Sequence, residues 1–334
     1  YTGEASILAI LMMIFGVAIL LLNQISVKSR KSYTTVTGKS GQISKFNLGR
    51  SGKYIIAIIL IIITFFTSIF PIVSFAFETF LPNPGDYSFL YTGDPDNLTT
   101  KWWVTNENIT ENGMYGQQGI LYNDMIWHAY KGTIMVSVCC ALTAGTIGTL
   151  IGYAVSKNRR SRWANYVNSM AFLPYLMPSI AVGVAFFILF SNKYVNLFNT
   201  YALLIIVGTV KYIPFASRSS LNSMLQLSGE IEEAAIIQDI PWTKRMTRII
   251  IPIQKTSIIS GYLLPFMTCL RELSLFILLC VQGFILSTTL DYFDEMGLYA
   301  FSSGINLILI VTILICNALV NKATGASLDK GIGG

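Results

Sequence analysis

A polar stretch between two long apolar runs carries the residues whose types and spacing are best suited to chemistry with a partner protein. Its members are acids, alanines, a turn residue and two prolines: Glu232, Glu233, Ala234, Ala235, Asp239, Pro241 and Pro252. Acids are favoured at the positive N-terminal end of a helix, and Asp tolerates the left-handed conformation of a tight turn. Proline is favoured in the first turn of a helix and interrupts a helix further along. The stretch therefore predicts two short helices joined by a turn, a rigid hairpin that can dock into a groove on another subunit.

The spacing of this stretch resembles the EAA loop of ABC importer permeases, in which E-A-A is followed at fixed intervals by Gly and by I-x-L-P. Three residues separate Ala235 from Asp239, nine separate Asp239 from Ile249, and the pattern closes with Ile251 and Pro252. Asp239 stands where the family has Gly, and Ile251 stands where it has Leu. The resemblance implies a cytoplasmic hairpin at 229–253 that couples the membrane subunit to an ATPase, with the seven residues named above as the coupling residues.

The composition is that of a membrane protein. Hydrophobic residues make up 53% of the 334 residues, charged residues make up 12%, and the mean hydropathy is +0.58, unlike an ordinary soluble domain. About 20 apolar residues in a helix cross the hydrocarbon core of a bilayer, which is about 30 Å thick. Seven runs are long enough and lie near residues 5–25, 54–79, 132–156, 164–191, 201–217, 256–284 and 302–321. The sequence predicts an all-α polytopic membrane protein, and the resemblance implies the type I ABC importer permease fold.

The positions of lysine and arginine predict the orientation, because these residues are retained on the cytoplasmic side. With the N-terminus outside, the cytoplasmic segments 24–53, 157–162, 211–255 and 322–334 hold 19 of the 23 lysines and arginines. Lys211 is counted with them because a lysine near a helix end can extend to the interface. This orientation places the hairpin in the cytoplasm, and the net charge of +6 then reflects topology, with nothing to indicate nucleic acid binding. The resemblance implies the cytoplasmic (inner) membrane of a bacterium.

A basic, Ser/Thr/Gly-rich linker at 31–53 is the clearest boundary in the chain. Its stretches 33–39 and 48–50 resemble the linker of fused permeases in the ferric iron ABC importer family, where two permease halves share one polypeptide. The chain would then begin within a longer protein, and its first span would be the last helix of an upstream half. We expect that helix at 1–30, the linker, a six-helix permease unit at 54–322 with an extracytoplasmic loop at 80–131, and a cytoplasmic tail at 323–334.

Two adjacent charges and three prolines fall within the predicted spans. Intramembrane charges cost about 2.5–3.5 kcal/mol each on insertion scales and usually face a bundle interior or a wet cavity. Arg271 and Glu272 are therefore predicted either to line the translocation route or its gate, or to form an interhelix ion pair that fixes packing. Pro174, Pro178 and Pro214 interrupt the backbone hydrogen bonds of their helices, and each is predicted to be a kink or a hinge.

A row of small residues lies on the second helix of the predicted unit. The row consists of Ala144, Gly145, Gly148 and Gly152. Small residues let helices approach closely in a bilayer, where packing drives helix association. The row therefore predicts the face on which this helix packs against its neighbours.

The sequence contains no catalytic constellation. The five cysteines lie in apolar runs without metal-binding spacing and are predicted to be buried small hydrophobes; they are Cys139, Cys140, Cys269, Cys280 and Cys316. The chain also lacks the G-x-x-x-x-G-K-[ST] phosphate loop, so ATP is expected to bind to partner subunits. We expect no catalytic residue, no metal and no cofactor in this chain.

The resemblance implies a transmembrane permease subunit of an ATP-driven importer that takes up ferric iron delivered by an extracytoplasmic binding protein. The expected partners are a cytoplasmic ABC ATPase dimer, the binding protein, a second permease half, fused or separate, and the lipid bilayer. Another solute, such as a phosphorylated sugar, phosphonate, thiamine or polyamine, is an alternative because relatives share the EAA loop. A channel or carrier that needs no ATPase is more distant, since ion-coupled carriers usually need several intramembrane carboxylates and only Glu272 lies well inside a span.

Cysteine labelling tests the predicted orientation. Cysteines introduced at Ser40 and Ser228 should react with membrane-impermeant reagents only in inside-out vesicles, because such reagents do not cross the bilayer. A cysteine at Asn106 should react in intact cells or spheroplasts. Labelling of position 228 from outside would contradict both the orientation and the docking of the hairpin to an ATPase.

Overall fold

The computed structural model describes residues 49–83, 85–88, 98–109, 116–192 and 194–324, together with five positions before residue 49. In these ranges the chain is helical, with only two isolated β-bridges. The elements are α2 (Gly49–Thr64), the π-helix η1 (Phe65–Ile69), α3 (Phe70–Glu78), α5 (Lys101–Val104), α6 (Asp124–Lys157), α7 (Arg162–Leu176), α8 (Ser179–Phe190), α9 (Tyr201–Gln226), α10 (Gly229–Ile237), α11 (Trp242–Arg245), the π-helix η3 (Met246–Ile250), α12 (Ile251–Ile253), α13 (Lys255–Leu270), α14 (Leu286–Glu295) and α15 (Tyr299–Thr324). The predicted all-α class is confirmed.

Four helical segments are long and apolar enough to cross a membrane, and two bent helix pairs bring the number to as many as six within the described residues. The four are Ser51–Glu78, Asp124–Lys157, Tyr201–Gln226 and Tyr299–Lys322. The pair α7 and α8 is bent by 101°, and the helix Trp242–Ile253 is bent by 86° from α13. The predicted first span near 5–25 lies outside the described residues except for five positions, so it stays a prediction, as does the linker.

Close contacts of α6 with α9 and α13 form the centre of the bundle. A Cβ atom added at Gly145 would lie 2.4 Å from the Tyr262 ring, and one at Gly148 would lie 2.5 Å from the Ala216 Cβ. These distances are shorter than any van der Waals contact, so only glycine fits at either position. The predicted small-residue face of α6 is therefore a packing face, as expected where close approach drives association in a bilayer.

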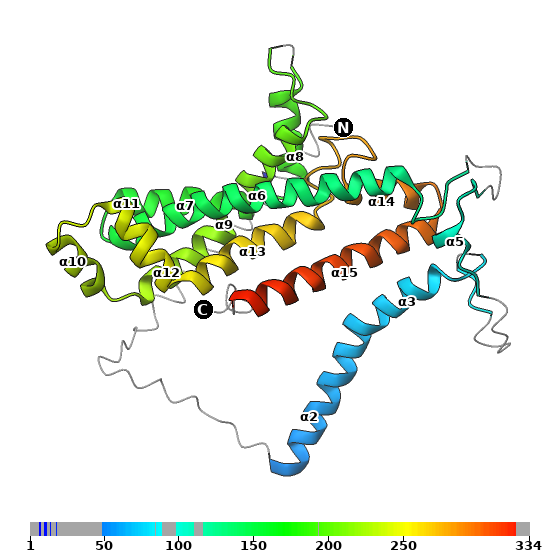
Figure 1. Ribbon diagram of the computed structural model, residues 1–334, viewed down its shortest axis with the longest axis horizontal. Helices are drawn as coiled ribbons and strands as arrows, with labels where there is room; N and C mark the ends of the chain where they lie inside the picture. The colour runs from blue at the N-terminus through cyan, green and yellow to red at the C-terminus, as the bar shows by residue number, and fades with distance from the viewer. Residues whose placement is uncertain are drawn as a thin grey trace.

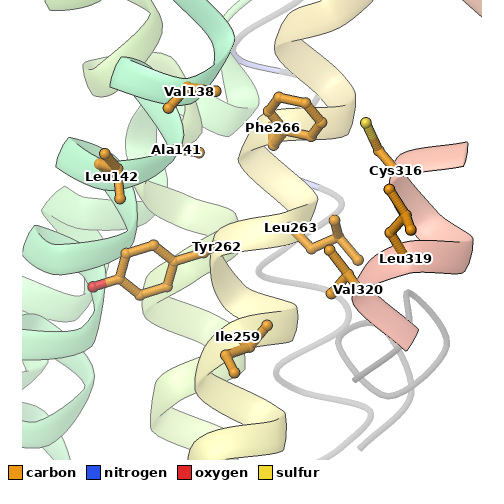
Figure 2. Close-up of a pocket in the computed structure, with 10 residues that line it drawn as sticks. All are labelled: Val138, Ala141, Leu142, Ile259, Tyr262, Leu263, Phe266, Cys316, Leu319 and Val320. Carbon is orange, nitrogen blue, oxygen red and sulfur yellow. The ribbon is translucent and has the colours of Figure 1, made fainter. Parts of the chain in front are cut away.

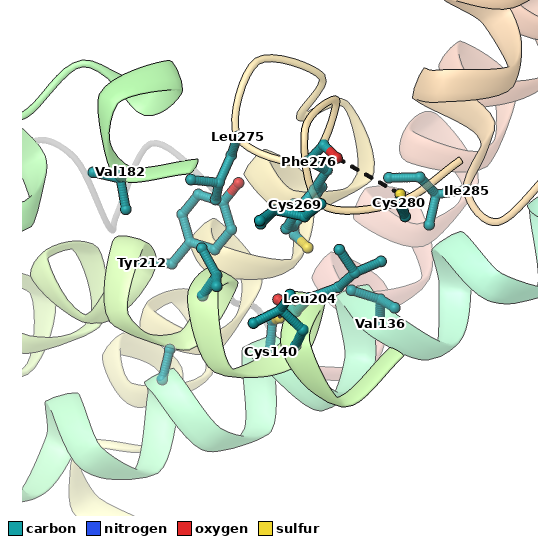
Figure 3. Close-up of a cluster of buried hydrophobic side chains, with 14 residues drawn as sticks. Val136, Cys140, Val182, Leu204, Tyr212, Cys269, Leu275, Phe276, Cys280 and Ile285 are labelled. Atoms are coloured by element: carbon teal, nitrogen blue, oxygen red, sulfur yellow. Dashed lines mark hydrogen bonds between the residues drawn. The ribbon is translucent and has the colours of Figure 1, made fainter. Parts of the chain in front are cut away.

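A cluster of buried apolar side chains fills the space between α6, α9 and the chain that follows α13 (Figure 3). It includes Cys140, Cys269 and Cys280, and the Cys280 thiol donates to the Phe276 carbonyl oxygen at 3.6 Å. The prediction of buried, apolar cysteines is confirmed for these three, whereas Cys139 and Cys316 are half-buried.

The predicted span at 256–284 is not a single helix. Helix α13 ends at Leu270, and the chain is then irregular until α14 begins at Leu286. Leu275 and Leu279 within the irregular segment are fully buried. An apolar run has the same hydropathy whether it forms a helix or a loop enclosed by other helices, so the sequence did not reveal the break.

Polar groups of neighbouring elements satisfy the backbone of this irregular segment. The Asn199 amide N–H donates to the Leu279 carbonyl oxygen at 3.1 Å, and the Val281 amide N–H donates to Asn199 Oδ1 at 3.1 Å. The Leu286 amide N–H donates to Thr133 Oγ1 at 2.7 Å. Irregular backbone at membrane depth is tolerated only where protein or water supplies such partners.

The two ends of the bundle carry different structures (Figure 1). At one end Trp102 is buried, donates from Nε1 to the Leu81 carbonyl oxygen at 2.7 Å and packs on Phe301. Helices α10, α11 and α12 gather at the opposite end, as the predicted orientation requires. Helix α6 begins within the expected outer loop 80–131, at Asp124, where Asn123 caps the helix by accepting from the Ile126 amide at 3.2 Å.

Candidate functional site

The predicted docking hairpin is formed by α10, a tight turn and the helical segment from α11 to α12. Asp239 has φ +53°, which is the left-handed conformation expected at this position. Its amide N–H donates to the Ile236 carbonyl oxygen at 2.9 Å, and the Ile240 amide donates to the Ala235 carbonyl oxygen at 3.1 Å. These two bonds form a Schellman motif, which ends a helix most readily with glycine and tolerates Asp less easily. The departure from the family's Gly is thus accommodated without changing the turn.

The two prolines delimit the second helical segment of the hairpin. Pro241 is the N-cap residue of α11, with φ −64°, one residue before the position predicted for it. Pro252 lies within the first two positions of α12, and the helix ends one residue after it, at Ile253, with Gln254 as the C-cap residue. The π-helix η3 precedes Pro252, and π turns are frequent at functional sites.

Helix α10 has two distinct faces. Glu232 and Ala235 are each 5% exposed and face the bundle. Glu233 and Ala234 are exposed, and Ile237, which follows Ala234 by three residues on the same helix, is 82% exposed. An acid, a small residue and a large apolar side chain displayed together are suited to a partner groove. The predicted coupling residues of α10 thus form two sets: Glu232 and Ala235 face the bundle, whereas Glu233 and Ala234 face outward.

Glu232 anchors the hairpin to the end of α6. Its Oε1 accepts from the Tyr153 hydroxyl at 2.5 Å and lies 3.9 Å from Arg245 Nε, while its Oε2 forms an ion pair with Lys157. Burial alone raises the pKa of Glu232, but the hydrogen bonds from Lys157 and Tyr153 and the charge of Arg245 together lower the pKa below its ordinary value. Glu232 is therefore ionised at neutral pH. No pattern in the sequence links Tyr153 or Lys157 to the hairpin, because both lie far from it in the chain.

A polar cavity of about 520 Å³ lies within the predicted membrane region. Its lining combines charged, hydroxyl and aromatic residues with the break between α7 and α8: Tyr175, Leu176, Met177, Pro178, Ser179, Lys211, Tyr212, Phe215, Thr268 and Glu272. The structure thus brings two of the predicted intramembrane residues, Pro178 and Glu272, to one site. Lys211 and Tyr212 join them, although the sequence analysis assigned them no role here.

Lys211 satisfies the carbonyl groups that the broken helix leaves free. Its Nζ donates to the Pro174 carbonyl oxygen at 3.0 Å and to the Met177 carbonyl oxygen at 2.6 Å. A cation at the C-terminal end of a helix also interacts favourably with the helix dipole. Lys211 is 9% exposed and lies in the middle of α9, so the expectation that it extends to the cytoplasmic interface was wrong. The helix continues to Gln226, beyond the predicted end of the span.

Glu272 is held by groups other than its neighbour Arg271. The Tyr212 hydroxyl donates to Glu272 Oε2 at 3.0 Å, and the Leu275 amide donates to Glu272 Oε1 at 3.2 Å. Arg271 is exposed, and no ion pair joins it to Glu272 among the described residues. Both residues lie just after α13 ends, so they are not inside a helical span as predicted. The ion-pair alternative therefore loses its basis, and Glu272 lines the cavity.

The three predicted hinge prolines have different surroundings. Pro174 lies inside α7, and Pro178 is the N-cap residue of α8 at the 101° bend. Pro214 lies inside α9, which continues to Gln226, and is buried. Pro174 and Pro178 therefore flank the break that borders the cavity, whereas Pro214 is packed within an unbroken helix.

These features define an integral membrane subunit with a helical hairpin at one end of its bundle and a polar cavity within its apolar interior. A profile of the family described as "Binding-protein-dependent transport system inner membrane component" matches residues 144–326, which is more than half of the chain and contains both features. The chain belongs to this family, and it is a type I ABC importer permease. Its expected fold is confirmed.

Three similar proteins illustrate the relationship. The ferric transport system permease protein FbpB 1 of Haemophilus influenzae is 24% identical over 279 residues, which cover 83% of this chain and 40% of FbpB 1. The chain thus spans about two fifths of that relative. The putrescine transport system permease protein PotI of Escherichia coli is 26% identical over 204 residues, covering 58% of this chain and 68% of PotI. A solved bacterial ABC transporter involved in alginate import aligns with a TM-score of 0.57 and 17% identity, over 82% of this chain and 98% of that one.

Hydrogen exchange tests the anchoring role of Glu232. A hydrogen bond to a charged group contributes about 1.5–3 kcal/mol, and about 1.4 kcal/mol corresponds to a tenfold change. Glu232→Gln should therefore speed amide exchange in residues 229–253 by at least about tenfold, measured by mass spectrometry on the purified protein. Glu230→Gln, which changes an exposed acid on the same helix, is the matched control. Equal exchange in the two variants would show that the ion pair does not hold the hairpin.

Proposed function

We propose that this chain is the membrane permease, or the second half of one, of an ATP-driven importer for ferric iron. The docking hairpin is the observation that carries the proposal, because a channel or ion-coupled carrier has no need of one. Ferric iron is favoured by the similarity to FbpB 1 over 83% of this chain. An extracytoplasmic binding protein would deliver the iron, and a cytoplasmic ATPase dimer would drive transport across the bacterial inner membrane. ATP would bind to those partners, and this chain would need no cofactor.

The coupling step would use the exposed face of the hairpin. Glu233, Ala234 and Ile237 would enter a groove on the ATPase, and its closure would displace the hairpin. The Schellman turn at Asp239 and the ion pair of Glu232 with Lys157 keep the hairpin from deforming when it is pushed. The displacement would then pass directly to α6, and through the chain connections to α9 and α13.

The polar cavity would be the part of the route that responds to this movement. It lies beside the break between α7 and α8, where the Lys211 ammonium and the Glu272 carboxylate border the same space. A second permease half would complete the route on the side where Arg271 is exposed. Packed interfaces that have two discrete arrangements can convert a small displacement into opening or closing of a route. Pro174 and Pro178, which flank the break between α7 and α8, are the candidates for the hinge of this movement.

Two alternatives follow from other observations. PotI is similar over 58% of this chain, so a polyamine is the strongest alternative solute, ahead of a phosphorylated sugar, phosphonate or thiamine. A channel or carrier without an ATPase is disfavoured by the hairpin. In an importer for either solute, the binding protein, rather than this chain, would select the solute.

Reconstitution tests the proposed solute and the coupling together. The complete importer in liposomes should hydrolyse ATP faster when a binding protein loaded with ferric iron is added, and putrescine should have no such effect. Stimulation by putrescine and not by ferric iron would overturn the iron proposal and leave the coupling intact. Glu233→Lys or Ala234→Arg should abolish the stimulation while the subunit remains folded and inserted.

The control for these variants is Glu107→Lys, which reverses an exposed acid on the opposite side of the membrane. It should leave binding of the ATPase unchanged in a pull-down. Preserved ATPase binding and uptake in Glu233→Lys and Ala234→Arg would contradict the coupling role of the hairpin.

A pair of variants tests the gate. Glu272→Gln and Tyr212→Phe each weaken the hydrogen bond that holds the Glu272 carboxylate, with little change in volume. We expect near-normal expression together with ATP hydrolysis that no longer requires the binding protein. Ser274→Ala, an exposed change two residues away, should remain coupled. Normal coupled uptake by both variants would leave Glu272 with a structural role only.

A further inference from the structure

An apolar groove opens on the side of the bundle between α6, α13 and α15 (Figure 2). It has a volume of about 310 Å³ and is distinct from the polar cavity, with which it shares no lining residue. Side chains from all three helices form its walls, among them Val138, Leu142, Ile259, Leu263, Phe266 and Leu319. Neither the docking hairpin nor the translocation route uses this groove.

The groove offers its occupant no strong hydrogen-bonding group, because the Cys316 thiol is only a weak donor. The one hydroxyl among its lining residues, that of Tyr262, points away from the groove (Figure 2) and lies 3.0 Å from Thr146 Oγ1. The accessible surface of the groove is apolar. A polar ligand would lose its hydrogen bonds to water here, at a cost of several kcal/mol on a hydrocarbon scale, so the groove selects hydrocarbon.

The groove reaches from the middle of the membrane toward its cytoplasmic side. Ile259 and Phe266 are within the first twelve residues of α13, which begins directly after the hairpin. Twelve helical residues span about 18 Å, or little more than half of the hydrocarbon core, which is about 30 Å thick. Leu319 likewise lies close to the C-terminal end of α15. The occupant therefore enters from the inner leaflet.

Two cations lie one turn beyond the groove toward the cytoplasm. Lys255 precedes Ile259 by four residues and Lys322 follows Leu319 by three, so each shares a helix face with a residue of the groove wall. Both lysines are exposed, and neither takes part in an ion pair within the described ranges. Basic sites between helices on the cytoplasmic side bind anionic lipid headgroups.

We infer that the groove binds an acyl chain of an anionic phospholipid from the inner leaflet, with the headgroup between Lys255 and Lys322. The two exposed lysines favour an anionic lipid over an apolar helix of the second permease half, because such a helix would offer no counter-charge to either ammonium group. The bound lipid would fix the spacing of α13 and α15.

Photocrosslinking in native membranes identifies the occupant. A benzophenone amino acid at Val138, which is 41% exposed in the groove, should give an adduct with the mass of a phospholipid in the complete importer. The same amino acid at Val311, an exposed residue of α15 outside the groove, reports ordinary contact with the bilayer. An adduct at Val138 with a helix of the second half would overturn the inference.

The headgroup is tested in nanodiscs that contain phosphatidylglycerol and phosphatidylcholine in equal amounts. Val138 should crosslink phosphatidylglycerol at least about fivefold more than phosphatidylcholine, and the combined change Lys255→Ser and Lys322→Ser should remove this preference. Lys244→Ser, a change of an exposed lysine in the hairpin, should preserve it. Equal crosslinking of the two lipids by the unchanged protein, or a preference that survives in the double variant, would refute the headgroup site.

Discussion

The need to satisfy backbone polar groups inside a hydrocarbon medium governs this structure. Helices α7 and α8 meet at a sharp bend, and the chain after α13 is irregular where the sequence predicts a membrane span. Each interruption is supported by a specific side chain: Lys211 bonds the carbonyl groups at the end of α7, and Asn199 and Thr133 bond the irregular segment. Without these partners, each exposed polar group would cost several kcal/mol in lipid.

The same constraint explains why the functional features occur where they do. A broken helix needs polar side chains beside it, and these side chains create a cavity that an unbroken bundle would lack. Lys211 and Glu272 can remain in the interior because each has hydrogen-bonding partners. The glycines on α6 have the opposite role, since they remove side chains so that α9 and α13 can approach. Polar support and close packing thus position the polar cavity, which we propose as part of the route.

The hairpin combines a fixed side with an open side. Glu232 and Glu233 are adjacent and chemically identical, yet one is enclosed by Tyr153, Lys157 and Arg245 and the other faces outward. A helix rotates by about 100° per residue, so neighbouring residues point in different directions and can serve different partners. One acid therefore holds the hairpin to its own subunit while the other is available to the proposed ATPase.

The sequence by itself determined the class and the hairpin, because these depend on composition and on spacing along the chain, and the distribution of its cations predicts the orientation. Asp239 in a left-handed turn was predicted from its residue type and from its position between two predicted helices, and is confirmed. Only the tertiary structure decided which partners lie around Glu232 and Glu272, since Tyr153 and Tyr212 are 79 and 60 residues away from them. It also decided that the run at 256–284 breaks at Leu270 and that Lys211 stays inside. Hydropathy records how apolar a segment is, whereas packing and hydrogen bonding between distant segments decide whether it remains a helix.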